Sequence, residues 1–141
     1  MDKIRVLLAD DHAEFRRVVC EFLKRIPHVS IVGEAVDGKD VVEQVERLSP
    51  DLVLMDISMP GQNGIEATRI IKARWPSTQV LIATTHDNRI YRLQAEEAKA
   101  DAYVKKSDLK SVLESVFRIP SGDASESSPS LKFNSIHRSN P

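Results

Sequence analysis

Apolar and polar positions along the chain follow two alternating periods, which predict strands and helices in turn. The run from Ile4 to Ala9 is dense in β-branched and aliphatic residues and predicts a strand. From His12 to Ile26, apolar residues recur three or four positions apart, which predicts one face of a helix that Pro27 stops. The same reasoning predicts further strands at 29–32, 51–56, 79–84 and 102–104, and helices that carry the apolar positions of 41–48, 67–71, 91–98 and 109–117.

Five strand–helix pairs in succession predict an α/β domain, in which helices cover both faces of a parallel sheet. Right-handed crossovers between parallel strands reduce the possible topologies to a doubly wound sheet. From about Pro120 the chain becomes rich in serine and poor in apolar residues. The sequence therefore predicts a folded domain over 1–119 and a disordered Ser-rich tail over 120–141.

Charge and composition argue against several classes of protein. Twenty basic and 21 acidic residues give a net charge of −1, which gives no sign of nucleic-acid or membrane binding. No apolar stretch is long enough to span a bilayer, and the N-terminus does not resemble a signal peptide. The single cysteine, Cys20, cannot form an intramolecular disulfide and lies in an apolar helical stretch, which predicts an inert core thiol. We therefore expect a cytoplasmic protein.

The predicted strand at 51–56 is the centre of the candidate chemistry, because it is apolar until it ends on a carboxylate. In an open parallel sheet, ligands bind beyond the carboxyl ends of the strands. Polar residues stand at this position after four of the five predicted strands, namely Asp10 and Asp11, Asp56, Thr84, and Lys105 or Lys106. The sequence therefore predicts one site that combines three carboxylates, a hydroxyl and a lysine.

This combination of side chains predicts phosphoryl chemistry with a divalent cation. Three close carboxylates repel one another, and a hard cation relieves that repulsion. Ligation by oxygen favours Mg²⁺, and no cluster of cysteine and histidine offers a zinc site. A carboxylate can act as the nucleophile that forms an aspartyl phosphate. The metal and the lysine would then neutralise charge on the transferring phosphoryl group.

Several motifs, in order, resemble the receiver domain of response regulators in two-component signalling. They are Val6-Leu7-Leu8-Ala9-Asp10-Asp11-His12, Asp51-Leu52-Val53-Leu54-Met55-Asp56, Met59-Pro60-Gly61, Asn63-Gly64, Leu81-Ile82-Ala83-Thr84-Thr85-His86-Asp87 and Ala102-Tyr103-Val104-Lys105-Lys106-Ser107. The resemblance runs from about Lys3 to Phe117. Taken singly, each residue has an ordinary explanation as a cap, turn or surface residue, so the ordered combination carries the prediction.

The branch of the family is indicated by three further stretches, besides the Asp-Asp-His opening: Val32-Gly33-Glu34-Ala35, Asp37-Gly38 and Glu66-Ala67-Thr68. They are most similar to receivers of the NarL/FixJ (LuxR-type) branch, which usually precede a DNA-binding helix-turn-helix domain. The resemblance implies a flavodoxin-like fold, with a five-stranded sheet in the order 2-1-3-4-5.

The resemblance also implies a role for each carboxylate. Asp56 would accept a phosphoryl group from a sensor histidine kinase or a phosphotransfer protein. Asp11, Asp56 and the backbone carbonyl of Ser58 would bind Mg²⁺, and Asp10 would act through water. The domain would catalyse its own phosphorylation and dephosphorylation without being a classical enzyme. Receivers of this type often form homodimers when they are phosphorylated.

The remaining site residues receive their roles in the same way. Thr84 would be the switch hydroxyl, and Tyr103 the aromatic residue that turns inward on activation. The family's spacing selects Lys106 rather than Lys105 as the phosphate-binding lysine. Ser58 and His86 stand at positions that tune dephosphorylation in the family. The lone histidines His12 and His86 are otherwise expected to be surface or capping residues.

Two departures from the family pattern and the length of the chain leave its output open. Ser107 stands where proline is frequent, and Ala98-Lys99-Ala100-Asp101 stands where Ala-Gly-Ala is frequent. The 24 residues after Phe117 are too few for a helix-turn-helix module. We expect either a stand-alone receiver that acts by protein contact or the receiver fragment of a DNA-binding transcription regulator. A Mg²⁺-dependent phosphohydrolase and a phosphorylation-independent scaffold are the alternatives from other classes.

Overall fold

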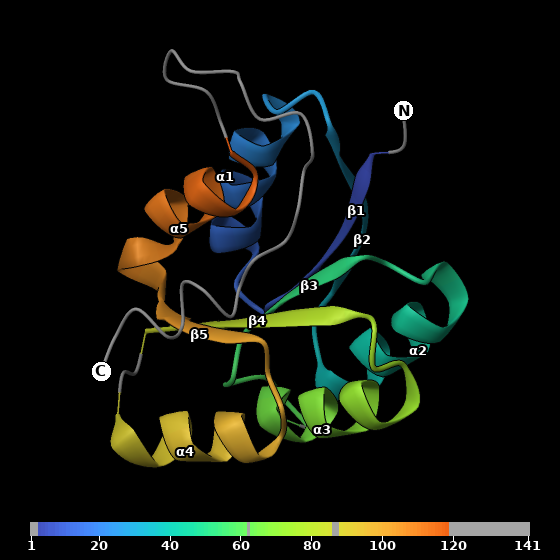
Figure 1. The fold of residues 1–141 in the computed structure, drawn as a ribbon, viewed down its shortest axis with the longest axis vertical. Coiled ribbons are helices and arrows are strands. Elements are labelled where there is room, and N and C mark those ends of the chain that lie inside the picture. Colours follow the sequence, from blue (N-terminus) through green and yellow to red (C-terminus); the bar gives the residue numbers. More distant parts are fainter. Residues whose placement is uncertain (1–2, 62, 86–87, 119–141) are drawn as a thin grey trace.

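Five parallel strands form the central sheet in the order β2-β1-β3-β4-β5, and helices lie on both of its faces (Figure 1). The computed structural model describes residues 3–61, 63–85 and 88–118. In chain order the elements are β1 (Ile4–Ala9), α1 (Ala13–Lys24), β2 (Val29–Ala35), α2 (Gly38–Leu48), β3 (Leu52–Met55), α3 (Gly64–Arg74), β4 (Gln79–Thr84), α4 (Arg89–Glu97), β5 (Ala102–Lys105), the 3₁₀ helix η1 (Lys106–Asp108) and α5 (Leu109–Val116). The predicted α/β class and the strand order 2-1-3-4-5 are confirmed.

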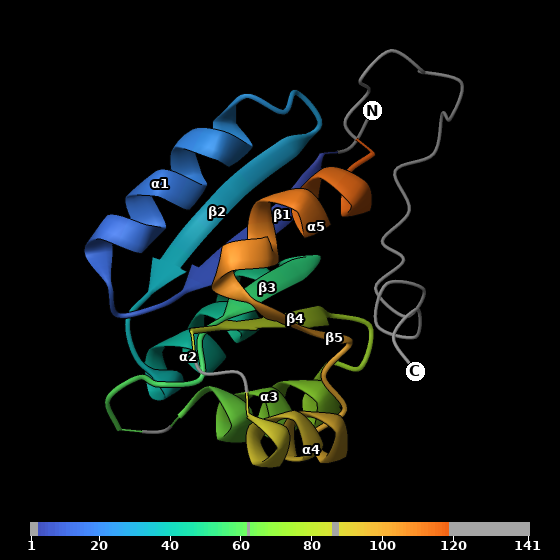
Figure 2. The ribbon, with the colours of Figure 1, turned by 90° about the vertical axis from the view of Figure 1, so that its left-hand side faces the viewer.

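Side chains alternate between the two faces of the sheet and build two separate apolar layers. On β1, Val6 and Leu8 pack under α1 and α5, whereas Leu7 and Ala9 pack against α2 and α3. Figure 2 shows this division, with α1 and α5 on one side of the sheet and α2, α3 and α4 on the other. Burial on both faces explains why the strands read as continuous apolar runs in the sequence.

Several boundaries differ from those that the sequence predicts. β2 runs to Ala35, beyond the predicted 29–32, because it stays paired with β1 until Ala35 lies opposite Ala9. α1 spans Ala13–Lys24, within the predicted 12–26, and its backbone continues as a turn before Pro27. β5 includes Lys105, which pairs with Thr84 at the end of β4.

Two residues assigned to apolar helix faces are exposed, which corrects the sequence interpretation. Leu93 is 50% exposed, whereas Ala95 and Ala98 are buried in the core. Leu93 and Ala95 are two positions apart, and residues at that spacing do not share a helix face. Val18 is 56% exposed, beside Val19, which is buried against the sheet. Burial in a helix thus follows narrower stripes than the apolar pattern alone suggests.

Two other expectations concern the membrane and the C-terminal region. Among residues 3–61, 63–85 and 88–118, no helix has both the length and the apolar character needed to cross a membrane. The tail predicted at 120–141 lies outside the described residues.

Candidate functional site

Two carboxylates are fixed at neighbouring strand ends by backbone hydrogen bonds of the sheet. The Asp56 N–H donates to the Ala9 carbonyl at 2.9 Å, and the Asp10 N–H donates to the Ala35 carbonyl at 3.0 Å. Parallel pairing therefore continues one residue beyond β3 and β1 before the chain leaves the sheet. Both residues are buried, at 4% exposed each. The sheet thus places two acidic groups side by side with little freedom to move apart.

The backbone that follows the strand is held by a close approach of α3. The Gly64 N–H, at the start of α3, donates to the Ile57 carbonyl at 2.9 Å. A Cβ atom at Gly64 would lie 1.9 Å from the Asp56 carbonyl oxygen, so only glycine permits this packing. The sequence indicates Gly64 as part of a motif before a helix, but it gives no sign of this tertiary contact.

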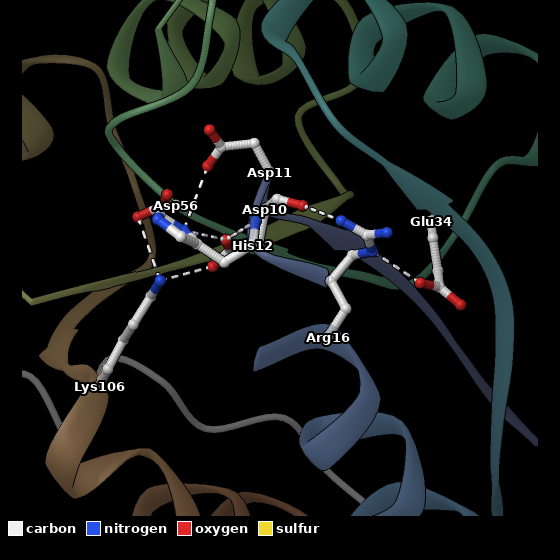
Figure 3. A network of polar contacts seen from close by, with 7 residues as sticks. All are labelled: Asp10, Asp11, His12, Arg16, Glu34, Asp56 and Lys106. Carbon is white, nitrogen blue, oxygen red and sulfur yellow. Dashed lines mark hydrogen bonds and ion pairs between the residues drawn. The ribbon is translucent and has the colours of Figure 1, made fainter. Parts of the chain in front are cut away.

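An acidic cluster with a histidine surrounds the ends of β1 and β3 (Figure 3). Asp10, Asp11, His12 and Asp56 each offer a ligand atom, and these atoms lie within 4.8 Å of one another. His12 Nδ1 is 2.9 Å from Asp10 Oδ1 and 3.2 Å from Asp11 Oδ1. His12 is the N-cap residue of α1 and its side chain is 64% exposed, as expected of a surface or capping residue. Its contact with both carboxylates was not predicted.

The donor set fits a hard divalent cation. All three aspartates offer oxygen, and Asp56 Oδ2 is buried without a hydrogen-bond partner among the described residues. Such an orphaned buried oxygen is unfavourable unless a ligand satisfies it. Asp11 lies at the exposed rim, which leaves room for the water ligands that Mg²⁺ keeps. Ser58, whose carbonyl was predicted as a further ligand, lies in the loop after β3 and its side chain is exposed.

The charge on Asp56 is unfavourable in this environment. Burial raises the pKa of Asp56 from 3.8 to about 6, and the neighbouring carboxylate of Asp10 adds to the effect. The ammonium of Lys106 lowers the pKa but does not compensate fully. Asp56 is therefore a carboxylate whose charged form is stabilised by any added positive charge nearby.

The structure separates the two candidate lysines. Lys106 Nζ lies 2.6 Å from Asp10 Oδ2 and 3.6 Å from Asp56 Oδ1, and its side chain is only 10% exposed. Lys105 is exposed at the end of β5. Lys106 starts η1, where the chain bends over the strand ends, so its side chain reaches the carboxylates (Figure 3).

Two other residues predicted to belong to the site, Thr84 and Tyr103, are both buried. Thr84 ends β4 and is 1% exposed, and Tyr103 on β5 is 5% exposed. The Arg92 guanidinium lies 4.7 Å from the centre of the Tyr103 ring. The Tyr103 ring is already buried in this structure. The expectation that it turns inward on activation therefore stays a prediction. His86 lies outside the described residues.

Two residues of α1 contact the site, although the sequence pattern indicates no role for them there. The Arg16 side chain donates to the Asp10 carbonyl at 2.7 Å and to Glu34 Oε1 at 2.7 Å, and thereby joins β1 to β2 (Figure 3). The Phe15 ring lies 4.2 Å from Lys106 Nζ. The three-to-four spacing predicts Phe15 only as part of an apolar helix face. No sequence pattern links residues 15 and 106, because their contact depends on how α1 packs beside η1.

Cys20 differs slightly from the predicted core thiol. It is half-buried, and its Sγ lies 3.7 Å from Glu34 Oε2. Burial raises the pKa of the Cys20 thiol, and the negative charge of Glu34 acts in the same direction. The thiolate is therefore disfavoured, which agrees with the inert thiol that the sequence predicts.

Comparisons with known proteins agree with this geometry. The family model of the response regulator receiver domain matches residues 6–117. The chain is 37% identical over 124 residues to the transcriptional regulatory protein DegU of Brevibacillus brevis, which covers 87% of this chain and 52% of DegU. This chain therefore spans about half the length of that curated relative.

Solved structures give the same picture. A LuxR-family two-component response regulator from Aurantimonas sp. SI85-9A1 is similar with a TM-score of 0.76 and 31% identity, over 99% of this chain and 100% of that chain. The isolated REC domain of RcsB from Salmonella enterica serovar Typhimurium, in the presence of the phosphomimetic BeF₃⁻, gives a TM-score of 0.74 at 25% identity. That match covers 83% of this chain and 89% of the other.

Proposed function

Because the chain belongs to the response-regulator receiver family, as its motifs predicted, we propose that it is a phosphorylation-dependent signalling domain with Asp56 as phosphoacceptor. The donor is a sensor histidine kinase or a phosphotransfer protein. The observation that carries the proposal is the buried Asp56 carboxylate, whose Oδ2 has no hydrogen-bond partner among the described residues while Lys106 lies 3.6 Å from Oδ1. One carboxylate oxygen thus has no hydrogen-bond donor that competes for its lone pairs, and the other lies beside a positive charge.

In the proposed step, an Asp56 carboxylate oxygen attacks phosphorus and forms a P–O bond as the bond to the donor breaks. With a phosphohistidine donor, the ring nitrogen leaves with the bonding electron pair; with acetyl phosphate, acetate leaves. Lys106 moves from Asp10 toward the phosphoryl oxygens, and the Thr84 hydroxyl donates to one of them. Asp11, Asp56 and the Ser58 carbonyl would hold Mg²⁺, with Asp10 acting through water, and the bound ion would supply positive charge that stabilises the transferring group.

The signal leaves the site through a change in the populations of two surface conformations. The phosphoryl group adds negative charge at the strand ends, which draws Thr84 and Lys106 toward it. Tyr103 and the surface of α4 and β5 then adjust, and a homodimer or another partner binds the favoured conformation. We place this activity in the cytoplasm, without direct contact to nucleic acid or membrane by the described domain.

Labelling with acetyl phosphate and Mg²⁺ tests the phosphoacceptor. Wild type should gain one phosphoryl group, and Asp56→Asn should gain none. Full labelling of Asp56→Asn at another residue would overturn the assignment. Removal of Mg²⁺ with a chelator should abolish labelling of the wild type, because the carboxylates then repel the incoming phosphate.

A matched pair of variants tests the lysine. Lys106→Ala should slow labelling and weaken the conformational response to beryllofluoride, because it removes the ammonium nearest to both carboxylates. Lys105→Ala should do little, because that side chain is exposed. The reverse ranking would contradict the proposed role of Lys106.

The output of the signal has two versions. The similarity to the transcriptional regulatory protein DegU, of which this chain spans about half, favours the receiver of a DNA-binding regulator. The other version is a receiver that acts through protein contact alone. Size-exclusion measurements with and without beryllofluoride would show whether phosphorylation drives dimerisation. The phosphohydrolase alternative is disfavoured, because exposed Ser58 stands where such enzymes need a second acid two residues after the nucleophile.

A further inference from the structure

Three of the described side chains lie close to the ammonium of Lys106, and one of them is aromatic. Two are the carboxylates of Asp10, at 2.6 Å, and Asp56, at 3.6 Å. The third is the ring of Phe15, whose centre lies 4.2 Å from Nζ. This distance is well inside the range in which the negative face of an aromatic ring attracts a cation. The attraction is stronger here than on an open surface, because the Lys106 side chain is only 10% exposed.

The position of the Phe15 ring explains how the Lys106 ammonium is oriented toward the carboxylates. Phe15 occupies a side of Nζ that water would otherwise hydrate, and a neutral ring does not compete with a phosphoryl group for the positive charge. Phe15 also lines the same small cavity as Asp10 and Asp56. The ring thus restricts the ammonium to the side of the site where its polar partners lie.

Without the Phe15 ring, a second conformation is open to the Lys106 side chain. A groove of about 290 Å³ runs between α1 and α5, and both Phe15 and Lys106 line it. A flexible lysine chain can turn its charge toward water in such a groove. Phe15 therefore lies where it can favour the conformation that faces the carboxylates over the conformation that faces the groove.

We propose that Phe15 is a positioning residue, which holds the Lys106 ammonium at the site for phosphoryl binding. This inference rests on the proposed function, since Lys106 needs aiming only if Asp56 receives a phosphoryl group. The contribution comes from the face of the ring, so leucine, which is apolar and a better helix former than phenylalanine, does not replace it.

The first test observes the contact directly, whatever the activity of the protein. Protons above an aromatic ring are shielded, so the Hε resonances of Lys106 should be shifted upfield in the wild-type NMR spectrum. Phe15→Leu should remove that shift. Phe22→Leu is the matched control, because Phe22 lies two turns later on α1, packs against the same apolar layer and lines the same groove. Unshifted Lys106 resonances in the wild type would overturn the inference.

The second test asks whether Phe15 acts through the charge of Lys106. In labelling by acetyl phosphate and Mg²⁺, Phe15→Leu should be about three- to tenfold slower than wild type. Phe15→Tyr, which keeps the ring face, should restore the rate to within about twofold, and Phe22→Leu should match the wild type. In a Lys106→Met background, Phe15→Leu should have no further effect on labelling.

The outcomes of the second test separate this inference from the proposed function. Labelling that persists in Asp56→Asn would overturn the proposed function. Labelling that needs Asp56, but falls equally with Phe15→Leu in both Lys106 backgrounds, would overturn only the role of Phe15. If Lys106→Met labels too slowly to measure, the rescue by Phe15→Tyr and the NMR shift decide the question.

Discussion

The charge of Asp56 should destabilise the metal-free fold, and Asp56→Asn should remove that penalty. The folded protein holds the pKa of Asp56 at about 6, above its ordinary value of 3.8, first because of burial and then because of Asp10. Between these two pH values the folded state binds more protons at this group than the unfolded state does. Stability therefore falls as the pH rises from about 3.8 to about 6, and the full penalty is present above that window.

The size of the penalty follows from the same pKa difference. A rise of the Asp56 pKa from 3.8 to about 6 lowers the free energy of unfolding by about 3 kcal/mol at pH 7.5 and by about 1 kcal/mol at pH 4.5. Asp56→Asn keeps the shape of the side chain and removes the charge, although it also removes a partner of Lys106. The expected gain is therefore at most about 3 kcal/mol at pH 7.5, or about 10 °C in Tm for a domain of this size.

Urea unfolding with a chelator present, at pH 7.5 and at pH 4.5, measures the effect. Glu43→Gln on the exposed side of α2 is the control, and its stability should stay within about 0.5 kcal/mol of the wild type. Added Mg²⁺ should stabilise the wild type more than Asp56→Asn, because the variant has lost a charged ligand. An Asp56→Asn protein less stable than the wild type at pH 7.5 would refute the electrostatic reasoning.

Three further predictions test how the site and its support are built. Gly64→Ala should lose about 3 kcal/mol in urea unfolding, because its Cβ would overlap the Asp56 carbonyl, whereas Gly61→Ala should lose only about 1 kcal/mol, since φ is +69° and nothing lies within 4 Å. Lys72→Met should lose about 2–3 kcal/mol, because the ammonium joins two backbone carbonyls and the Asp101 carboxylate at 2.8–2.9 Å. Lys99→Gly should raise Tm by a few degrees, since Lys99 has φ +70°, a left-handed conformation that glycine adopts more easily. An unchanged or lower Tm would contradict the reasoning that the Lys99 backbone is strained.

The fold was predictable because its signals are local and repeat. Each strand is an apolar run, each helix follows with a three-to-four spacing, and the strand ends carry the polar residues of the site. The departure at Ala98-Lys99-Ala100 was also visible, and the structure shows its consequence as a left-handed Lys99. Exposure was less predictable, because Val18 and Leu93 are as apolar as their buried neighbours.

The contacts that complete the site were not predictable from local sequence. Gly64 must be glycine because a carbonyl from another segment touches it, and Phe15 faces Lys106 across 91 positions of the chain. Arg16 looks like an exposed helix residue in the sequence, yet it binds the Asp10 carbonyl. Each of these depends on the packing of α1 or α3 onto the strand ends, which periodicity does not encode.

The arrangement of charges suggests why the site responds to a phosphoryl group. Three carboxylates share one lysine, and Lys106 lies closer to Asp10 than to Asp56. The carboxylate with the raised pKa is therefore also the one with the longer ion-pair distance and with a buried oxygen that has no hydrogen-bond partner among the described residues. A substitution that relieved this strain, such as Asp56→Asn, would stabilise the fold and remove the proposed nucleophile at once. The instability of Asp56 and its proposed reactivity thus have the same physical cause, and a more stable version of this site would be a poorer phosphoacceptor.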